Sequence, residues 1–308
     1  MLGGGVFVTQ NKVLPGAYIN FVNASRATAT LGERGVVAIP YALNKSEGEV
    51  ITITASEFLK DSETILGITY DSDAAKPFRE IFTHATECII YDLGEEGTAA
   101  QAIEALEPYD FNILAVYTST SADVTAYINA VKTWRDAGKK CQAVVYNGTN
   151  PNHEGIINVV STVSDEEAAP HSLVAWVAGA EAGCEVNASC TNMLYDGEYS
   201  VVTDKSQTQL EESLGNGEFV FHLVYGNVRV LEDINSMTET TADKGEDFKA
   251  NQTIRVIDQI ANDIARIFNT KYLGKIPNNA SGRVSLWGDI VSHHRQLETI
   301  QAIETFDA

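Results

Sequence analysis

Hydrophobic and polar positions follow one pattern up to about residue 86 and a different one after it. Before this point, short apolar runs alternate with turn signals, and the runs at 35–39, 50–54 and 64–70 are typical of strands. The run at 50–54 also alternates apolar and polar side chains in its second half. This pattern predicts a small β domain over residues 26–86.

From residue 87 the chain alternates buried-type strands with amphipathic helices. Strands are expected at 88–91, 111–117, 141–146 and 156–160, and helices at 98–106, 121–137 and 166–182. Strands that are apolar along their whole length need cover on both faces. The alternation therefore favours an α/β domain with a largely parallel sheet, which we place at residues 87–235.

The last third of the chain favours helices and one hairpin. A short helix is expected at 207–214, and runs at 219–225 and 228–231 flank a Gly226-Asn227 turn. A long helix over 248–268 carries a clear apolar stripe through Ile254, Ile257, Ala261, Ile264 and Ile267–Phe268. A last helix over 286–303 is expected to turn Leu286, Ile290, Leu297 and Ile300 inward, within a C-terminal domain at 236–308.

The charge of the chain restricts its partners. The sequence has 42 acidic and 21 basic residues, for a net charge of −21 over 308 residues. Nucleic acid and anionic membranes attract basic surfaces, so we expect neither as a partner. We also find no apolar run near the roughly 18 residues of a membrane span and no secretory signal at the N-terminus. These features favour a protein made in the cytoplasm.

The four cysteines show no metal-binding pattern. Cys88 and Cys141 lie inside strand-like apolar runs, where buried thiols are expected. Cys184 and Cys190 lack the spacing of a zinc site, and a disulfide between them stays an open alternative.

The residue types that could act in catalysis or bind a ligand occur without the neighbouring residues that complete a known motif. We therefore predict no catalytic, cofactor-binding or metal-binding residue. The sequence holds neither a nucleophile elbow nor a phosphate-binding loop. Asp71 and Asp73 lack the glycine and distal glutamate of a calcium loop. Asp92, at a strand end, supports a rival hypothesis of an α/β hydrolase-like enzyme.

The sequence predicts an extended arm over the N-terminal 25 residues. A glycine run at 3–5 precedes short apolar stretches that cannot satisfy their backbone groups alone. The arm must therefore pair with its own domain, as in a monomeric binding module, or with the sheet edge of another molecule. In the second case an inter-subunit contact would be made by Val13, Leu14, Ala17, Tyr18, Ile19, Phe21 and Val22.

Four segments occur in an order that resembles one family. They are the opening arm, 174–183 with 189–192, 228–238, and 248–258 continuing to 272–278. With these four segments taken together, the chain resembles the contractile tail sheath proteins of phages and phage-like bacteriocins, in particular sheath proteins of the Gram-positive type. Small residues at Ala178, Gly179, Ala182 and Gly183 would allow close helix packing in any case.

The resemblance implies a multidomain α/β architecture and a mechanical role. It implies a β-sandwich-like domain at 26–86, an α/β domain of subtilisin-like topology, and a C-terminal domain that here stops before a final strand. It also implies no cofactor and a helical sheath of identical subunits, made in the bacterial cytoplasm and then part of a virion or tail-like particle. Its further partners would be a tail tube protein and baseplate components.

The resemblance also suggests which residues meet the partners. In the family the C-terminal region faces the tube. We therefore assign a tube contact to the last helix, at His293, His294, Arg295, Glu298 and Gln301. In a lattice of acidic subunits the cations should gather at contacts, and the candidates are Arg255, Arg266, Lys271, Lys275 and Arg283.

Overall fold

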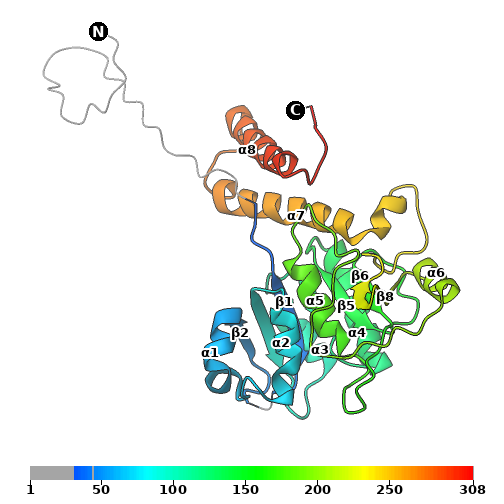
Figure 1. Cartoon of the computed structure of the whole chain (residues 1–308). Helices are drawn as coiled ribbons and strands as arrows, with labels where there is room; N and C mark the ends of the chain where they lie inside the picture. Colours follow the sequence, from blue (N-terminus) through cyan, green and yellow to red (C-terminus); the bar gives the residue numbers. More distant parts are fainter. Residues whose placement is uncertain (1–30, 44, 308) are drawn as a thin grey trace, which may run out of the picture.

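A computed structural model describes residues 31–43 and 45–307 of the chain. The predicted inter-subunit arm, Val13 to Val22, lies outside these residues. In the described part, one sheet stands between two helical layers, and two C-terminal helices lie at one end of this body (Figure 1).

The main sheet has seven strands in the order β2-β3-β1-β4-β5-β6-β7. Every neighbouring pair is parallel except β2 and β3, so β2 is an antiparallel edge strand. The strands are β1 (Val36–Tyr41), β2 (Val50–Thr54), β3 (Glu87–Asp92), β4 (Ile113–Ala115), β5 (Gln142–Tyr146), β6 (Ile156–Val159) and β7 (Glu218–Phe219). A mixed, parallel-rich sheet agrees with the α/β prediction.

The region at 26–86 does not form a separate β domain, which corrects that prediction. Strand β1 pairs with both β3 and β4 in the middle of the main sheet. Residues Val37 to Pro40 are all buried, because helices cover β1 on both faces. A strand that is apolar on both sides is stable only between two such layers. The first strand therefore belongs to the α/β body.

The strand predicted at 64–70 is also wrong, because this segment ends helix α1 (Ala55–Leu66). Thr54 and Glu57 form a capping box, in which each side chain bonds the backbone of the other residue. Gly67 then ends the helix with φ 74°, a left-handed conformation that suits glycine. These two end signals bound a helix, and the apolar residues near 65–68 do not extend as a strand.

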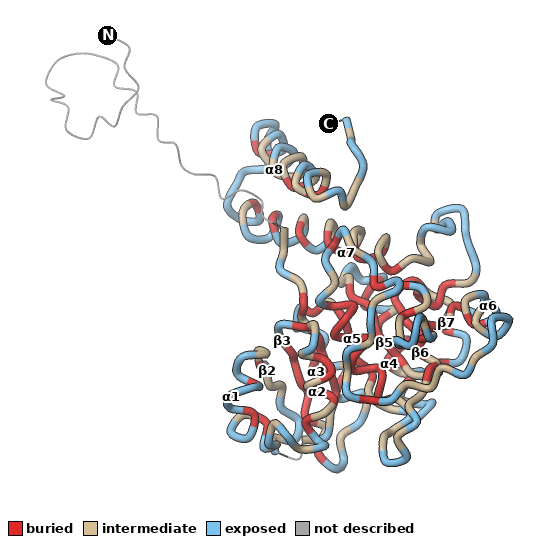
Figure 2. The backbone as a smooth tube through the Cα atoms, viewed as in Figure 1, coloured by how far each residue is buried: buried red, intermediate tan, exposed pale blue. Residues whose placement is uncertain are grey.

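Helices cover the sheet on both faces (Figure 2). Helices α2 (Lys76–Phe82) and α5 (Leu173–Gly183) pack with α1 on one face, and α3 (Ala99–Leu106) and α4 (Ser121–Asp136) pack on the other. Helix α5 is buried on all sides from Leu173 to Ala182. It begins seven residues later than predicted, because Pro170 disfavours helical backbone at the residue before it.

Close approach of α5 to α2 depends on glycine, as the small residues of this segment predict. A Cβ atom at Gly179 would overlap the carbonyl oxygen of Ile81. We expect Gly179→Ala to lower the free energy of unfolding by about 1–3 kcal/mol, because α2 would have to shift. Denaturant unfolding measures this change. Gly215→Ala in α6 is the control, since its Cβ meets nothing within 4 Å, and an equal loss there would refute the packing argument.

The remaining elements lie mostly in the last third of the chain. They are α6 (Gln207–Gly215), β8 (Phe221–Val224), β9 (Asn227–Val230), α7 (Asn251–Ile267), a π-helical turn (Phe268–Tyr272) and α8 (Ala280–Thr299), with 3-10 turns at Asp73–Ala75 and Glu246–Lys249. Strands β8 and β9 form the predicted hairpin, although its turn residues are Tyr225 and Gly226. None of the described helices has the length and apolar character needed to cross a membrane.

Candidate functional site: a buried polar junction at helix α7

Helix α7 packs on the α/β body mainly through polar side chains. Its buried residues are Asn251, Ile254, Arg255, Asp258, Gln259, Asp263 and Ile267. Three members of the predicted apolar stripe, Ile257, Ala261 and Ile264, are only partly buried. We call the buried polar contacts of α7 with the rest of the chain the α7 junction. The junction has three centres, and each joins α7 to different segments.

The first centre surrounds Arg255, whose side chain is 1% exposed. Its Nη2 atom lies 2.6 Å from Oε2 of Glu181 in α5 and 3.3 Å from Oδ2 of Asp233. Asp233 also accepts hydrogen bonds from the Cys190 backbone and from Asn251. Burial raises the pKa of Glu181 well above its usual range, as does the nearby Asp233 carboxylate. Burial also acts on Asp233, but Arg255 and the donors lower its pKa overall.

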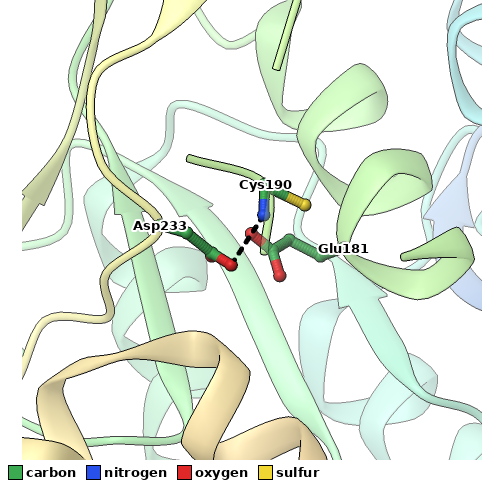
Figure 3. Close-up of side chains that lie close together, drawn as sticks. All are labelled: Glu181, Cys190 and Asp233. Atoms are coloured by element: carbon green, nitrogen blue, oxygen red, sulfur yellow. Dashed lines mark hydrogen bonds between the residues drawn. The ribbon is translucent and has the colours of Figure 1, made fainter. Parts of the chain in front are cut away.

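A metal is a poor fit to this centre, although its donor atoms lie close together. One ligand atom each from Glu181, Cys190 and Asp233 falls within 4.8 Å of the others (Figure 3). However, the guanidinium of Arg255 already supplies a cation to both carboxylates. A second positive charge beside it would be repelled. The arrangement thus serves as an ion-pair network between α5, the 231–235 segment and α7.

The second centre joins α7 to α4. Arg135 forms a bidentate salt bridge with Asp258, with N–O distances of 2.6 and 2.9 Å, and also donates a hydrogen bond to the Cys141 carbonyl. Such bidentate geometry is among the strongest side-chain contacts. Glu154 lies beside this pair and accepts from Lys244 at 2.7 Å. Buried pairing of this kind fixes α7 in one orientation on the sheet.

The third centre is Asp263, which joins three segments. Its carboxylate accepts from the Gly32 backbone at 3.1 Å and from His293 Nε2 in α8 at 2.9 Å. Gln259 and Arg266 of α7 also donate to it. Burial would raise the pKa of Asp263, but His293, Gln259 and Gly32 lower it by hydrogen bonding. Asp263 therefore ties the segment before β1 to both C-terminal helices.

His293 is the member of the predicted tube contact that the structure corrects. Its side chain is 0% exposed and faces α7, so it offers no surface to a partner in this conformation. Its burial follows from the hydrogen bond to Asp263. His293 thus lies on the inward side of α8, where the sequence pattern predicts only apolar residues. Of the others, Arg295 and Gln301 are exposed, while His294 and Glu298 are partly buried.

A cleft of about 480 Å³ opens at the carboxyl ends of β1, β3 and β4. This is where an α/β enzyme would place its site. The lining includes Tyr41, Thr98, Tyr117, Asp123 and Tyr127 but no histidine, cysteine or lysine. The carboxylate of the lining is Asp123, and among the described residues no hydrogen bond joins it to a hydroxyl group of the cleft, as an activated nucleophile would need.

Asp92, the residue of the enzyme hypothesis, has a structural role beside the cleft. Its buried carboxylate accepts backbone hydrogen bonds from Leu43, Lys45, Ser46 and Gly94 at 2.8–3.0 Å. Burial alone would raise its pKa, but these donors lower the pKa overall. A carboxylate whose oxygens are already occupied by four donors is a poor general base, and it instead holds the loop after β1.

The thiols are free in this structure. Cys88 and Cys141 are buried, as predicted, and burial raises the pKa of Cys141 to about 12. Cys184 and Cys190 lie within hydrogen-bonding contact of each other. The Cys190 thiol lowers the pKa of Cys184 to about 7, against the effect of burial.

A buried carboxyl elsewhere in the body predicts a pH effect. Burial raises the pKa of Glu80 in α2 from 4.5 to about 7, although the Glu198 backbone and Tyr195 donate to it. Between these values the folded chain holds a proton that the unfolded chain releases. This group's contribution to stability is therefore complete below pH 4.5 and lost as pH rises through 7.

We expect Glu80→Gln to remove this pH dependence. The variant should gain up to about 3 kcal/mol relative to the wild type between pH 4.5 and pH 8, measured by denaturant unfolding at each pH. His153 has a pKa lowered by burial to about 4 and acts in the opposite direction, so only the difference between the proteins is informative. Glu104→Gln at an exposed position is the control, and parallel pH curves for Glu80→Gln and wild type would contradict the prediction.

Comparison with known proteins agrees with this architecture. The phage tail sheath central domain matches residues 95–236, and the phage tail sheath C-terminal domain matches residues 243–308. An α/β body followed by a helical C-terminal region, matched in this order, defines a structural protein of phage tails. The chain belongs to the phage tail sheath family.

Individual relatives support the same assignment. The chain is 36% identical over 171 residues to the phage-like element PBSX protein XkdK of Bacillus subtilis, which covers 53% of this chain. It is 25% identical over 280 residues to the tail sheath protein of Clostridium phage phiCD119, which covers 85% of this chain and 78% of that protein. The match spans about a third of XkdK, at 36% of its length.

Solved structures show the same fold. A sheath tail protein from Desulfitobacterium hafniense superposes with a TM-score of 0.83 at 27% identity, over 95% of this chain and 91% of that one. The helical sheath of the anti-feeding prophage, in its contracted state, superposes with a TM-score of 0.72 at 16% identity, over 96% and 86% of the two chains. At this lower identity the likeness concerns the fold alone.

Proposed function

We propose that this protein is a non-enzymatic structural subunit of a contractile tail sheath. Many copies would polymerise helically around a tail tube and contract to drive the tube through a target envelope. The observation that carries the proposal is the match of the whole described body to sheath tail proteins, with both sheath domains in order. In the cleft at the carboxyl ends of the strands, no hydrogen bond among the described residues pairs a hydroxyl group with Asp123, so its geometry does not favour the enzyme alternative.

The α7 junction suits a subunit that moves as a rigid body. Contraction of a sheath requires each copy to change its neighbours without unfolding. Three buried centres, at Arg255, Arg135 and Asp263, hold the C-terminal helices on the sheet in one arrangement. Buried polar pairs permit few alternative packings, because a shifted helix would leave charges unpaired. The movement would therefore take place between subunits.

Partners follow from this role. The proposal includes copies of the same chain, a tail tube protein and baseplate components, but neither nucleic acid nor membrane. Assembly would take place in the bacterial cytoplasm, and the product would be a virion or tail-like particle. The proposal assigns the tube contact to His294, Arg295, Glu298 and Gln301. It also includes a C-terminal domain at residues 236–308 and a subtilisin-like topology of the α/β domain.

Electron microscopy of the full chain, alone and with its tube protein, tests the proposal. We expect rings or helical sleeves whose wall is built of this chain. A uniform monomer under every condition, with or without the tube, would contradict it. Purified protein that turns over a substrate and never polymerises would favour the enzyme alternative.

A further inference from the structure

Two surfaces of opposite charge lie at opposite ends of the described body. Between Asp263 and Asp289 the sequence has four cations, Arg266, Lys271, Lys275 and Arg283, and no acidic residue. Arg266 and Lys271 form ion pairs with Asp263 and Asp289 at the two ends of the stretch, so Lys275 and Arg283 carry its excess positive charge. This segment includes the end of α7, the π-helical turn and the start of α8. In a chain with a net charge of −21, such a stretch is the exception. We call it the basic face.

The basic face also exposes large apolar side chains. Leu273 is 60% exposed, Val284 is 70% exposed and Trp287 is 58% exposed. Phe268 and Ile276 are each about 40% exposed on the same segment. Exposed tryptophan and other large apolar residues on one segment, with polar and charged residues among them, are typical of a surface that binds another protein.

Acidic residues lie beside the cleft at the other end of the sheet. Glu47, Glu95 and Glu96 are exposed on the loops after β1 and β3, and Asp123 lines the cleft from α4. Glu47 packs against Gly94, which brings the two loops together. Lys45, the lysine of the first loop, donates to carbonyl groups at the end of α1. We call these four carboxylates the acidic rim.

The chain path places the two surfaces far apart. Gly32, just before β1, bonds Asp263 beside the basic face, whereas Tyr41 at the end of β1 lines the cleft. A six-residue strand between them spans about 20 Å. In Figure 1 the C-terminal helices accordingly lie at one end of the body and the carboxyl ends of the strands at the other. One copy therefore cannot satisfy both surfaces with its own residues.

We propose that the basic face of one copy binds the acidic rim of a second copy of this chain. This inference rests on the proposed function, and it names two surfaces through which the subunits would contact one another in the assembly. Two different surfaces that meet head to tail make a heterologous contact, which leaves both ends open and generates rings or helices. Opposite charges also bring the copies together despite their shared negative charge, and salt would weaken the contact.

Charge reversal in the full-length chain tests this contact. We compare Lys275→Glu/Arg283→Glu on the basic face, Glu95→Lys/Glu96→Lys on the rim, and all four changes together. The combined variant keeps the wild-type net charge and restores opposite charges at the contact. Lys60→Glu on exposed α1 is the control for a charge change outside both surfaces. Sedimentation velocity at low and high salt gives the self-association constant.

We expect each double variant to associate about tenfold or more weakly than wild type at low salt. The combined variant should recover to within about threefold. Double variants that behave like the Lys60→Glu control, or a combined variant that does not recover, would overturn the inference. If polymers of all variants form equally well, only this inference fails and the proposed function stands. If the basic-face variant loses binding to the tube protein alone, the tube is the occupant and the inference is also wrong.

Discussion

Replacement of Arg255 by methionine should lower the free energy of unfolding by about 3–5 kcal/mol. The side chain is almost fully buried between Glu181 and Asp233, with an N–O distance of 2.6 Å to the first. Without its guanidinium, a buried carboxylate loses its counter-ion and the Ala188 carbonyl loses its donor. The cost comes from this uncompensated charge, since methionine fills a similar volume. Denaturant unfolding measures it.

Two further variants separate this explanation from a general packing defect. Arg266→Ala removes a cation from the same helix, but that side chain is 54% exposed, so we expect a loss below about 1 kcal/mol. The triple variant Arg255→Met/Glu181→Gln/Asp233→Asn should be more stable than Arg255→Met alone, because no buried charge is left over. A triple variant that is less stable than the single one would show that the charge argument is wrong.

Deletion of residues 1–22 should abolish assembly while leaving the folded body intact. Among the described residues, the seven-stranded sheet and the apolar clusters on its two faces are built from residues 36–230. Strand addition to a neighbouring subunit, the role that we propose for this segment, would supply main-chain hydrogen bonds that no other proposed contact replaces. We therefore expect the loss of rings and sleeves in electron microscopy, at a concentration where the full chain assembles.

The thermal unfolding midpoint of the deleted protein is the control for its fold. It should lie within a few degrees of the full chain measured as a monomer. A second control replaces residues 1–22 with a glycine-serine segment of equal length, which keeps the chain length but cannot form a stable strand. Assembly that persists in either variant would refute the role of the arm.

The α/β architecture could be predicted from the sequence, but the place of the first strand could not. Apolar runs and helical stripes identified the strands and helices from residue 87 onward, because each follows its own period. The run at 36–39 has the same buried character. Its partners β3 and β4 lie roughly 50 and 75 residues further on, and pairing over such distances leaves no local signal. A local signal did exist for α1, in Thr54 and Glu57.

The α7 junction could have been predicted only in part. The apolar stripe of α7 predicts only part of its buried side, because Ile254 and Ile267 are buried whereas Ile257, Ala261 and Ile264 are only partly buried. A second set of residues, Asn251, Arg255, Asp258 and Gln259, recurs at helical spacing and is also buried. Polar residues usually face solvent, so the pattern alone does not predict that these four are buried. Its partners Glu181, Asp233 and Arg135 come from distant segments, and only the fold shows that they neutralise these charges.

The bond between Gly32 and Asp263 determines where a mechanical load would enter the molecule. A pull on the chain ahead of Gly32 meets Asp263 first, and through it α7 and His293 of α8, before it reaches β1. A force applied to the chain before Gly32 would therefore be shared with the C-terminal helices and would not act on the hydrogen bonds of β1 alone.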